Sequence, residues 1–531
     1  MANKIVDQEL AKLVSQTAEI SPSSLGSTCG VWSDSIAPEI EQIEVRILDE
    51  VKQTIEWTKN QKSISFSSFE KALRPYIFLL ARLFISLFLC MREMHFKEQH
   101  PGHVRGYKWQ KPTSRLLGTS FGKVRYWRSY LYQQGAGFYP LDLELGLTRD
   151  GFSIFMLGLA TRIATKMSYA QTVILLGLFL EWSPAQATIE ESVLGFGQFS
   201  RHWFESAPVP ADDGEVLVIQ LDSKATPTAT EEELEKRRGP RAKNAHPNSQ
   251  RHRGKAKRQR SGKKTRRKKG DKSKNGRMST IVVMYTLRRS EDGSLEGPIN
   301  KKVYASYAPK KHAVAIARRE ADKRGFDSTS GKLVQIVTDG DNDLARYINQ
   351  LFPEAIHTID VFHVTEYLWE AGHALFKEGS DELLEWVEKQ KKALYSDKAC
   401  EIIAELDQQL SRIPKYQKSY SRLKKVRHYI SKRLENMNYK SLREQDLEIS
   451  SGAVEGAVNY VIARRFDCGG MRWIKERAEA LLQLRCIEVN GDWDAFIEFV
   501  HYQLLQEGKD SRNNPTLKCK NPAPLPNYGL N

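Results

Sequence analysis

The chain has 531 residues, more than a single hydrophobic core normally organises, so several domains are expected. Hydrophobic residues make up 40% of it, which is enough to bury cores and excludes wholesale disorder. The formal net charge is +16, and the six cysteines form no Cys-x-x-Cys pair, so neither a disulfide framework nor a structural zinc site is indicated.

The first 100 residues have the apolar spacing of helices, seen in residues 40–57 and again in residues 69–89. The longest apolar run, residues 76–91, is short for a membrane span and carries Arg82 at its centre. No apolar segment follows the N-terminal charges as it would in a secretory signal. We therefore expect a helical N-terminal region, residues 1–100, in a soluble cytoplasmic protein without a membrane partner.

A β-hairpin is expected over residues 114–132, where the pattern alternates and Gly118 and Gly122 serve as turn residues. Its exposed face would interleave basic and aromatic side chains, as nucleic-acid-binding surfaces do. The alternative is an ordinary hairpin that is solvated on one side and packed on the other. The side chains assigned to this face, of which the basic ones are candidate DNA contacts, are Arg115, Lys123, Arg125, Arg128, Tyr126 and Trp127.

Two short helical patterns follow in residues 168–197, separated by a turn near Trp182. Ser183 can cap the second helix, and Pro184 suits its first position. This spacing is that of a helix-turn-helix, although two consecutive amphipathic helices are more often plain bundle. Residues 101–205 are accordingly predicted to be a DNA-binding region.

Residues 206–362 change to alternating strands and helices. Apolar strands are expected at 215–225, 279–289 and 301–308, then a helix, a strand at 333–339, a second helix, and a fifth strand near residue 360. This is the element order of an RNase H-like fold. The predicted fold class is therefore an α/β core with a mixed five-stranded sheet, joined to an all-helical insertion and a mainly helical N-terminal DNA-binding region.

A polybasic stretch, residues 236–277, interrupts the first two strands of this core. It holds twenty Lys and Arg against one acid, so the positive excess of the whole chain resides there. The composition predicts a disordered insert whose commonest partner is a phosphate backbone. A solvated insertion without a partner is the alternative. Candidate DNA contacts within it are Arg266, Arg267, Lys268 and Lys269.

Residues 363–447 contain helical patterns and no strand-forming stretch, which predicts a helical insertion before the last core helix. Lys424 and Lys425 lie in its most basic part and are candidate DNA contacts. Residues 448–497 are assigned to the last helical region of the core. Residues 498–531 end in a polar, Pro- and Asn-rich sequence and are predicted to be a flexible tail.

Three carboxylates stand at the ends of core elements. Asp222 and Asp339 each end an apolar strand, and Glu455 lies at the edge of the buried stripe of a helix, beside Gly456. Taken singly, an Asp after a strand turns the chain or caps a helix, and a first-turn Glu answers the helix dipole. Together they are hard oxygen ligands suited to two Mg²⁺ ions, with Mn²⁺ as a substitute.

The acids near Asp339 alternate as in a calcium-binding loop, but the position that needs glycine is Leu344 and the closing acid would be Gln350. The calcium interpretation is therefore rejected. Asp339 is preferred as the ligand because it stands at the strand end, and Asp341 is the fallback.

Five segments resemble bacterial insertion-sequence transposases of the Kra type, which are similar to the Mutator lineage. The resemblance extends over roughly residues 114–496 and is most specific after residue 450. It rests on GFYPLDLELGL, VTDGDNDL, DVFHVTEYLWEAG, SSGAVEGAVNYVIARRFDCGGMRW and AEALLQLRCIEVNGDWDAF. One departure is the absence of a cysteine pair before the first segment.

This resemblance implies a DDE mechanism, with Asp222, Asp339 and Glu455 as catalytic metal ligands. It also brings accessory candidates, namely Asp360 and His363 as an Asp-x-x-His pair and Arg472 and Trp473 as possible DNA contacts. A core histidine bonded to Asp360 and a packing role for Trp473 are the alternatives.

The expected function is DNA transposition. The chain would bind terminal inverted repeats and target DNA as a homodimer or larger assembly, and would catalyse two-metal-ion strand cleavage and strand transfer. Two rival interpretations remain open: a nuclease of the same fold without strand transfer, and a domesticated DNA-binding protein.

Overall fold

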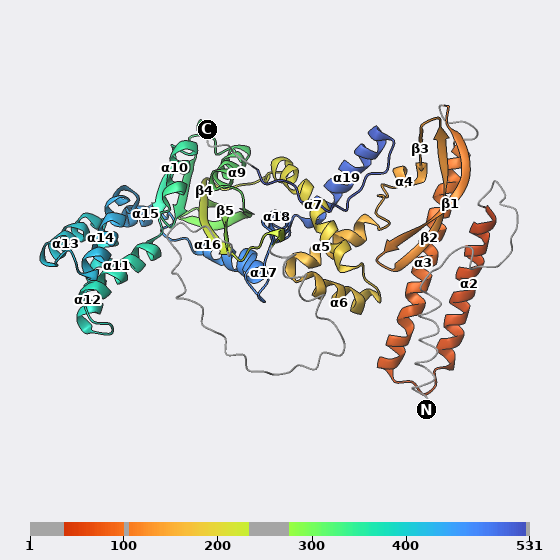
Figure 1. The fold of residues 1–531 in the computed structure, drawn as a ribbon, viewed down its shortest axis with the longest axis horizontal. Coiled ribbons are helices and arrows are strands. Elements are labelled where there is room, and N and C mark those ends of the chain that lie inside the picture. Colours follow the sequence, from red (N-terminus) through yellow and green to blue (C-terminus); the bar gives the residue numbers. More distant parts are fainter. Residues whose placement is uncertain (1–36, 100–105, 233–275, 527–531) are drawn as a thin grey trace. The chain divides into compact units, whose positions relative to one another are not determined.

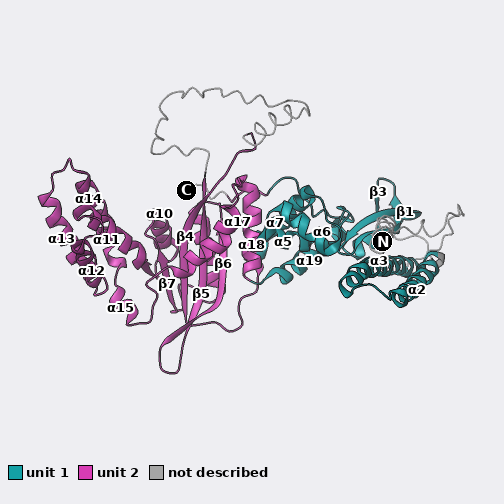
Figure 2. Ribbon diagram, turned by 90° about the horizontal axis from the view of Figure 1, so that it is seen from below, with its two compact units in different colours: residues 1–203, 491–522 teal, residues 204–490, 523–531 magenta. Residues whose placement is uncertain are grey.

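The structure is a computed structural model, and it describes residues 37–99, 106–232 and 276–526. These residues form two compact units, which are described separately (Figure 2): residues 1–203 with 491–522, and residues 204–490 with 523–531. The basic stretch lies outside the described residues apart from its last two positions, and so do the candidate contacts Arg266, Arg267, Lys268 and Lys269.

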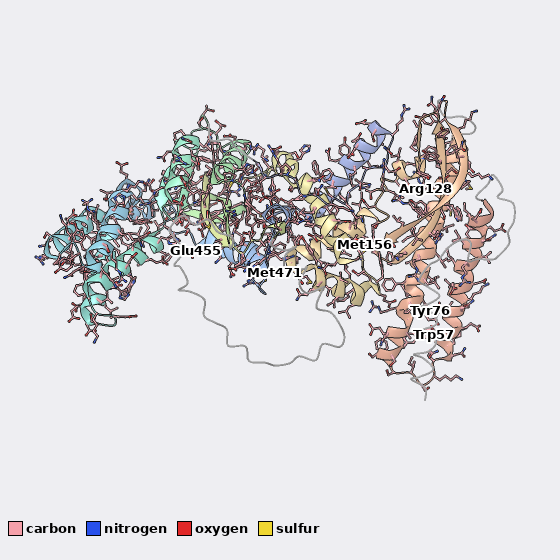
Figure 3. The ribbon with its side chains drawn as sticks, viewed as in Figure 1. Trp57, Tyr76, Arg128, Met156, Glu455 and Met471 are labelled. Atoms are coloured by element: carbon pink, nitrogen blue, oxygen red, sulfur yellow. The ribbon has the colours of Figure 1, made fainter. Side chains whose placement is uncertain are left out.

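Unit 1 begins with a helical hairpin, as the sequence predicts for residues 37–99. Helices α2 and α3 pack through Ile43 and Ile47 on one side and Leu79 and Leu83 on the other. At the other end of the pair, Trp57 lies with its ring centroid 5.0 Å from that of Tyr76 (Figure 3). The two helices are α2 (Ala37–Asn60) and α3 (Phe66–Gln99).

Helix α3 is long and apolar enough to cross a membrane by length and composition alone, a test that core helices of soluble proteins also pass. Two of its charged side chains are buried among protein partners. Arg82 donates to the Phe121 carbonyl at 3.0 Å, and Glu93 accepts a hydrogen bond from the Ser129 amide at 2.8 Å. The helix therefore serves as packing for the sheet that follows it.

That sheet is antiparallel, with Thr119 paired to Gly122 across a two-residue turn, so the predicted hairpin is confirmed. Its strands are β1 (Lys108–Thr119), β2 (Gly122–Gln133) and β3 (Ala136–Phe138). The prediction of one exposed basic and aromatic face is wrong, because the side chains belong to two faces. Tyr126 is fully buried, whereas Lys123 is exposed and Arg125 and Trp127 are partly exposed.

Arg115 and Arg128 lie on the buried face and are bound to Asp142, a fully buried acid in α4. The Arg115 guanidinium donates to Asp142 Oδ2 at 2.9 Å, the Tyr126 hydroxyl donates to Oδ1 at 2.7 Å, and Arg128 forms a second ion pair. Two of the predicted DNA contacts, Arg115 and Arg128, are therefore part of a cluster in which Asp142 balances their charge.

The middle of α7 is fully buried: Thr161 of α5 is hydrogen-bonded to Ser192 at 2.9 Å, and Phe496 of α19 lies against Phe196 with ring centroids 6.3 Å apart. The predicted helix pair is thus present, but its second helix forms core. The predicted tail is also wrong at its start, because α19 continues through residue 511 and Asp150 then accepts a hydrogen bond from the Leu517 amide at 2.7 Å. These helices are α4 (Pro140–Glu144), α5 (Ile154–Lys166), α6 (Tyr169–Leu180), α7 (Gln186–Ser206) and α19 (Trp493–Ser511).

Unit 2 contains the five-stranded sheet, in the spatial order β6-β5-β4-β7-β8. Figure 1 shows β4 and β5 among the helices of the unit, and β7, β4, β5 and β6 are labelled in Figure 2. The first three strands in sequence pair antiparallel, and β7 and β8 run parallel to β4. This is the RNase H-like topology that the element order predicts. The strands are β4 (Val216–Thr226), β5 (Arg277–Arg289), β6 (Leu295–Ser306), β7 (Leu333–Thr338) and β8 (Ile356–Ile359).

Helices cover both faces of this sheet. Leu217, Ile219 and Leu221 of β4 pack against α9 (Lys310–Lys323) and α10 (Asn342–Leu351). The opposite face contacts the C-terminal helical segments of the unit. These are α16 (Gly452–Ala457), the π-helical segment η3 (Val458–Ala463), α17 (Arg464–Phe466) and α18 (Lys475–Val489).

The predicted helical insertion has a hydrophobic core of its own, which includes Leu368, Val387, Leu406 and Val426. It starts directly after β8 and returns the chain to the face of the sheet that α16 covers. Its elements are α11 (Val361–Leu375), α12 (Asp381–Leu394), α13 (Ala399–Arg412), α14 (Lys418–Ser431), η2 (Leu434–Asn436) and α15 (Tyr439–Arg443).

We expect Asp142→Ala to destabilise unit 1 by about 3 to 5 kcal/mol, because it leaves Arg115 and Arg128 buried without their counter-charge. Thermal denaturation measures the loss. Lys123→Ala, an exposed change on the same hairpin, is the matched control and should alter stability by less than about 0.5 kcal/mol. Equal melting of the two variants would contradict a structural role for the cluster.

Candidate active site

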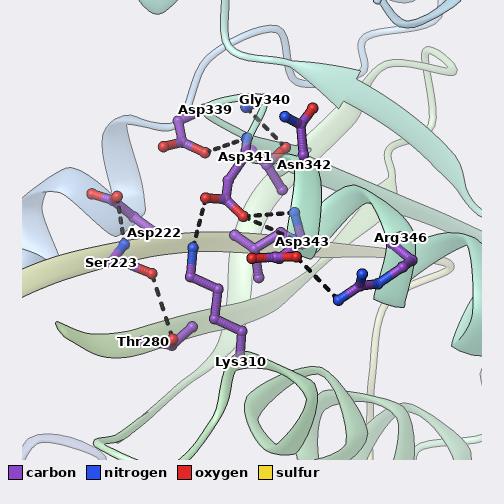
Figure 4. A network of polar contacts seen from close by, with 12 residues as sticks. Asp222, Ser223, Thr280, Lys310, Asp339, Gly340, Asp341, Asn342, Asp343 and Arg346 are labelled. Atoms are coloured by element: carbon purple, nitrogen blue, oxygen red, sulfur yellow. Dashed lines mark hydrogen bonds and ion pairs between the residues drawn. The ribbon is translucent and has the colours of Figure 1, made fainter. Parts of the chain in front are cut away.

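Asp222 and Asp339 emerge side by side at one edge of the sheet (Figure 4). Strands β4 and β7 are parallel neighbours, and each acid comes directly after Leu221 and Thr338, the last pair between these two strands. Asp339 follows the end of β7, whereas Asp222 lies within β4, which stays paired with β5 as far as Thr226. The pKa of Asp222 lies above its ordinary value, mainly because burial disfavours the charged form, and the charges of Asp339 and Asp360 add to the rise. The two acids therefore lie near each other, but the prediction that Asp222 ends its strand is wrong, because the pairing of β4 with β5 continues beyond it.

Asp341, the fallback ligand, is engaged elsewhere. Its Oδ1 caps α10 by accepting the amides of Asp343 and Leu344, and its Oδ2 accepts a hydrogen bond from Lys310 at 2.6 Å (Figure 4). Burial opposes its ionisation, but these hydrogen bonds outweigh burial and hold its pKa below the ordinary value. The Asp341 amide in turn donates to Asp339 Oδ1 at 2.9 Å. This arrangement favours Asp339 as the acid that is available for a ligand.

A second group of side chains gathers at the start of the insertion. Ligand atoms of Asp360, His363 and Glu455 lie within 4.8 Å of one another. Asp360 follows β8, is fully buried and caps α11, and its Oδ2 accepts the hydroxyl of Ser451. The same hydroxyl lies 3.5 Å from Glu455 Oε1. Glu455 therefore lies beside Asp360 and His363, the pair that only the family resemblance indicates.

Asp222 and Asp339 are not members of that group of three, yet Asp222 interacts electrostatically with both Asp360 and His363. The two groups thus form one charged edge of the sheet. Carboxylate oxygens with an imidazole fit a hard divalent cation, and the mutual repulsion of Asp222, Asp339 and Asp360 is relieved when such an ion binds. The residues present fit the metal that the sequence predicts.

The helix that carries Glu455 is not regular. It begins as α16 and widens into the π-helical η3, a departure that is frequent at functional sites. Arg485 of α18 donates to the carbonyls of Tyr460 and Val461 in this segment, the latter at 2.8 Å. The wider turn is therefore supported by a side chain from the neighbouring helix.

Buried glutamines on the sheet hold the segment that leads to Glu455. Gln220 of β4 accepts the Val454 amide at 3.0 Å, which caps α16, and donates to the Ser450 carbonyl at 3.2 Å. Gln335 of β7 exchanges hydrogen bonds with the backbone of Glu448, at 2.6 and 3.0 Å. The pleat places Gln220 and Asp222 on the same face of the sheet, so these amides fix the third acid relative to the first.

The remaining predicted site residues that the structure describes in unit 2 are Trp473, Arg472, Lys424 and Lys425. Trp473 is buried, its indole donates to the Phe466 carbonyl at 3.2 Å, and Arg465 lies 4.8 Å from its ring, so the packing alternative describes it. Arg472 and Lys424 are exposed. Lys425 is exposed as well and forms an ion pair with Glu370 at 2.7 Å.

An RNase H-like sheet with one acid in its first strand and another directly after its fourth is typical of a class of nucleic-acid-processing enzymes. Within that class, residues 301–467 match a family model described as a transposase, of the ISL3 type. The match supports a DNA transposase and includes Asp339, Asp360, His363 and Glu455. It does not confirm the Kra type that the motifs resemble.

The comparison with solved structures gives a weaker result. A similar chain is that of the Drosophila P element transposase strand transfer complex, with 12% identity over 69% of this chain and 84% of that one, and a TM-score of 0.22. At this score the likeness carries no argument. No curated protein matches the chain significantly.

We expect Asp222→Asn to raise the melting temperature of the metal-free protein at about pH 7. A carboxyl whose pKa is higher in the folded state contributes stability that is lost as the pH rises through that value. Asparagine carries no charge at any pH, so the variant does not lose this stability as the pH rises. Differential scanning calorimetry in chelator, repeated below about pH 4 where the two proteins should converge, measures the effect.

Asp343→Asn, at an exposed position two residues after Asp341, is the control and should leave the melting temperature unchanged. A lower melting temperature for Asp222→Asn at neutral pH would show that the Asp222 charge stabilises the fold instead.

Proposed function

We propose that the protein is the DDE-type DNA transposase of a bacterial insertion sequence, cutting DNA at the ends of its element and joining those ends to target DNA. The observation that carries the proposal is the charged edge formed by Asp222, Asp339 and Glu455 with Asp360 and His363, in a chain whose core matches a transposase model. The finer assignment to the Kra type is part of the proposal and rests on the motifs alone.

In this proposal, Asp222, Asp339 and Glu455 hold two Mg²⁺ ions, with Mn²⁺ as a substitute, and Asp360 and His363 are accessory ligands. Such ions activate the attacking oxygen and stabilise the leaving oxygen of a phosphodiester. Ser451 keeps Asp360 and Glu455 in a common orientation by its hydrogen bonds to both. Glu455 is exposed, which leaves it accessible to an incoming DNA backbone.

The same acids serve both chemical steps, since hydrolysis frees a 3′-hydroxyl that then attacks the target strand. Lys310 contributes indirectly: by neutralising Asp341 it keeps that acid engaged at the start of α10. Asp339 then remains the one acid of its loop that is directed to the charged edge.

DNA recognition is assigned to unit 1 and to basic surfaces of unit 2. Terminal inverted repeats would be bound through residues 101–205, where Lys123, Arg125 and Trp127 lie on the more exposed face of the hairpin. Lys424, Arg472 and the basic stretch would add contacts to the phosphate backbone. Two ends must be handled together, so we propose a homodimer or larger assembly acting on the nucleoid in the cytoplasm.

We predict that Asp222→Asn, Asp339→Asn and Glu455→Gln each abolish cleavage of DNA that carries the element's ends, while binding in a mobility-shift assay persists. Each change keeps the shape of the side chain but removes the charge that holds a divalent ion. Glu448→Gln is the control and should retain cleavage, because Glu448 accepts a hydrogen bond from Tyr285 at 2.9 Å and lies outside the charged edge.

The same assay separates the proposal from its rivals. A pre-cut end with a free 3′-hydroxyl must yield joined product if the protein is a transposase. Cleavage without joining would identify a nuclease of this fold, and binding without either reaction would identify a DNA-binding protein that has lost its chemistry.

A further prediction concerns the basic stretch, whose charge is known from the sequence alone. Replacing residues 237–274 by a short Gly and Ser linker should weaken DNA affinity and flatten its dependence on salt, because fewer counterions are released. Preference for the element's ends over random DNA should survive. An unchanged salt slope in fluorescence anisotropy titrations would identify a solvated insertion with no DNA contact.

A further inference from the structure

The helical insertion is attached to the catalytic edge of the sheet by side chains that donate to backbone carbonyls. All the accepting carbonyls lie at the ends of β7 and β8, the two strands that lead into Asp339 and Asp360. The bonds run from Tyr429 to the Asp339 carbonyl at 2.8 Å, from Arg433 to Gly340 at 2.9 Å, from Asn436 to His357 at 2.9 Å, and from Tyr439 to Ile359 at 2.8 Å.

Tyr429, near the C-terminal end of α14, and Arg433, two residues after that helix, form the part of this attachment that holds the Asp339 turn. The Arg433 guanidinium donates to the Tyr429 carbonyl at 3.0 Å and to Asn342 Oδ1 at 3.0 Å, and it lies 4.1 Å from the centre of the Tyr429 ring. The opposite face of that ring stacks on Tyr367, with centroids 3.8 Å apart. Tyr429 is itself buried, so its hydroxyl is held in place by packing.

Gly340 is the feature that permits this approach. Its φ of +83° is a conformation that residues with a side chain rarely adopt. A Cβ at this position would lie 2.6 Å from Arg433 Nε and 2.8 Å from the Tyr429 hydroxyl. The glycine therefore serves two purposes: it turns the chain after Asp339, and it leaves room for α14.

We propose that Tyr429 and Arg433 are positioning residues for the Asp339 carboxylate, so that the insertion sets the geometry in which this acid receives a divalent cation. The inference rests on the proposed function. Its physical basis is that the Asp339 carbonyl belongs to the peptide plane between Asp339 and Gly340, and the Gly340 carbonyl to the peptide plane that follows. Fixing both restricts rotation about the backbone bonds beside the Asp339 α-carbon, and the direction of the carboxylate follows from that restriction.

The test measures Mn²⁺ binding to the full-length, metal-free protein by electron paramagnetic resonance of the free ion, so that it does not depend on activity. Tyr429→Phe removes one hydroxyl and keeps the ring with its stacking. We expect its Mn²⁺ dissociation constant to rise about three- to tenfold, the loss of one net hydrogen bond. Arg433→Lys, which keeps the charge but loses the planar fork, should give a rise of similar size.

Tyr367→Phe is the matched control, because it lies in the same stack and makes no contact with the Asp339 turn. It should bind Mn²⁺ as the wild type does. Melting temperatures in chelator are recorded for all variants, since a merely structural role would lower the melting temperature and leave Mn²⁺ affinity unchanged.

Asp339→Asn distinguishes a failure of the proposed function from a failure of the positioning role. If wild-type binding is not reduced by Asp339→Asn, Asp339 is not a ligand and the proposed function falls together with the inference. If Asp339→Asn abolishes binding while Tyr429→Phe and Arg433→Lys bind normally, the metal site stands and the positioning role is refuted. Equal weakening by Tyr367→Phe would refute it as well, because general packing would then explain the effect.

Discussion

The repulsion among like charges at one edge of a sheet is the constraint on which the rest of unit 2 depends. Asp339 and Asp360 follow β7 and β8, Asp222 lies in the neighbouring parallel strand β4, and Glu455 joins them from a helix. Without a cation these groups oppose one another: burial is the main cause of the raised pKa of Asp222, and the charges of Asp339 and Asp360 raise it further. The fold must therefore hold them by contacts that do not involve their charges.

Neutral hydrogen bonds provide that support from several directions. Gln220 and Gln335 fix the segment before Glu455 to the centre of the sheet, Ser451 connects Asp360 with Glu455, and Tyr429 holds the turn after β7. Gln220, Gln335 and Tyr429 act on backbone atoms and take up no carboxylate oxygen, whereas the Ser451 hydroxyl donates to Asp360 Oδ2 itself. Lys310 acts differently, because its ammonium group binds the carboxylate of Asp341, the acid of the Asp339 loop that caps α10.

The sequence predicts the element order of the core and two acids of the site because both follow from local patterns: continuous apolar runs and a carboxylate at the end of each run. Asp222 ends the apolar run of β4 but not the strand, which stays paired with β5 as far as Thr226. The supporting glutamines were missed, although each is the lone amide in an otherwise apolar strand, a signal that was available. The prediction of the hairpin face is wrong because it combines odd- and even-numbered residues of one strand, whose side chains point to opposite faces. Tyr126 and Arg128 lie on one face, and Lys123 and Arg125 lie on the other. Contacts such as Tyr429 with Asp339 join residues 90 positions apart, and no local pattern predicts them.

The order of the catalytic residues along the chain has a consequence for biosynthesis. Asp222 and Asp339 leave the ribosome early, but Glu455 follows only after the whole insertion has been synthesised. Unit 1 is likewise incomplete until α19 and residues 512–522 have been added. A polypeptide that terminates before residue 455 therefore lacks Glu455, and one that terminates between residues 455 and 511 has the acids but an unfinished unit 1, so under the proposed function the nascent chain would gain its chemistry before its N-terminal unit is complete.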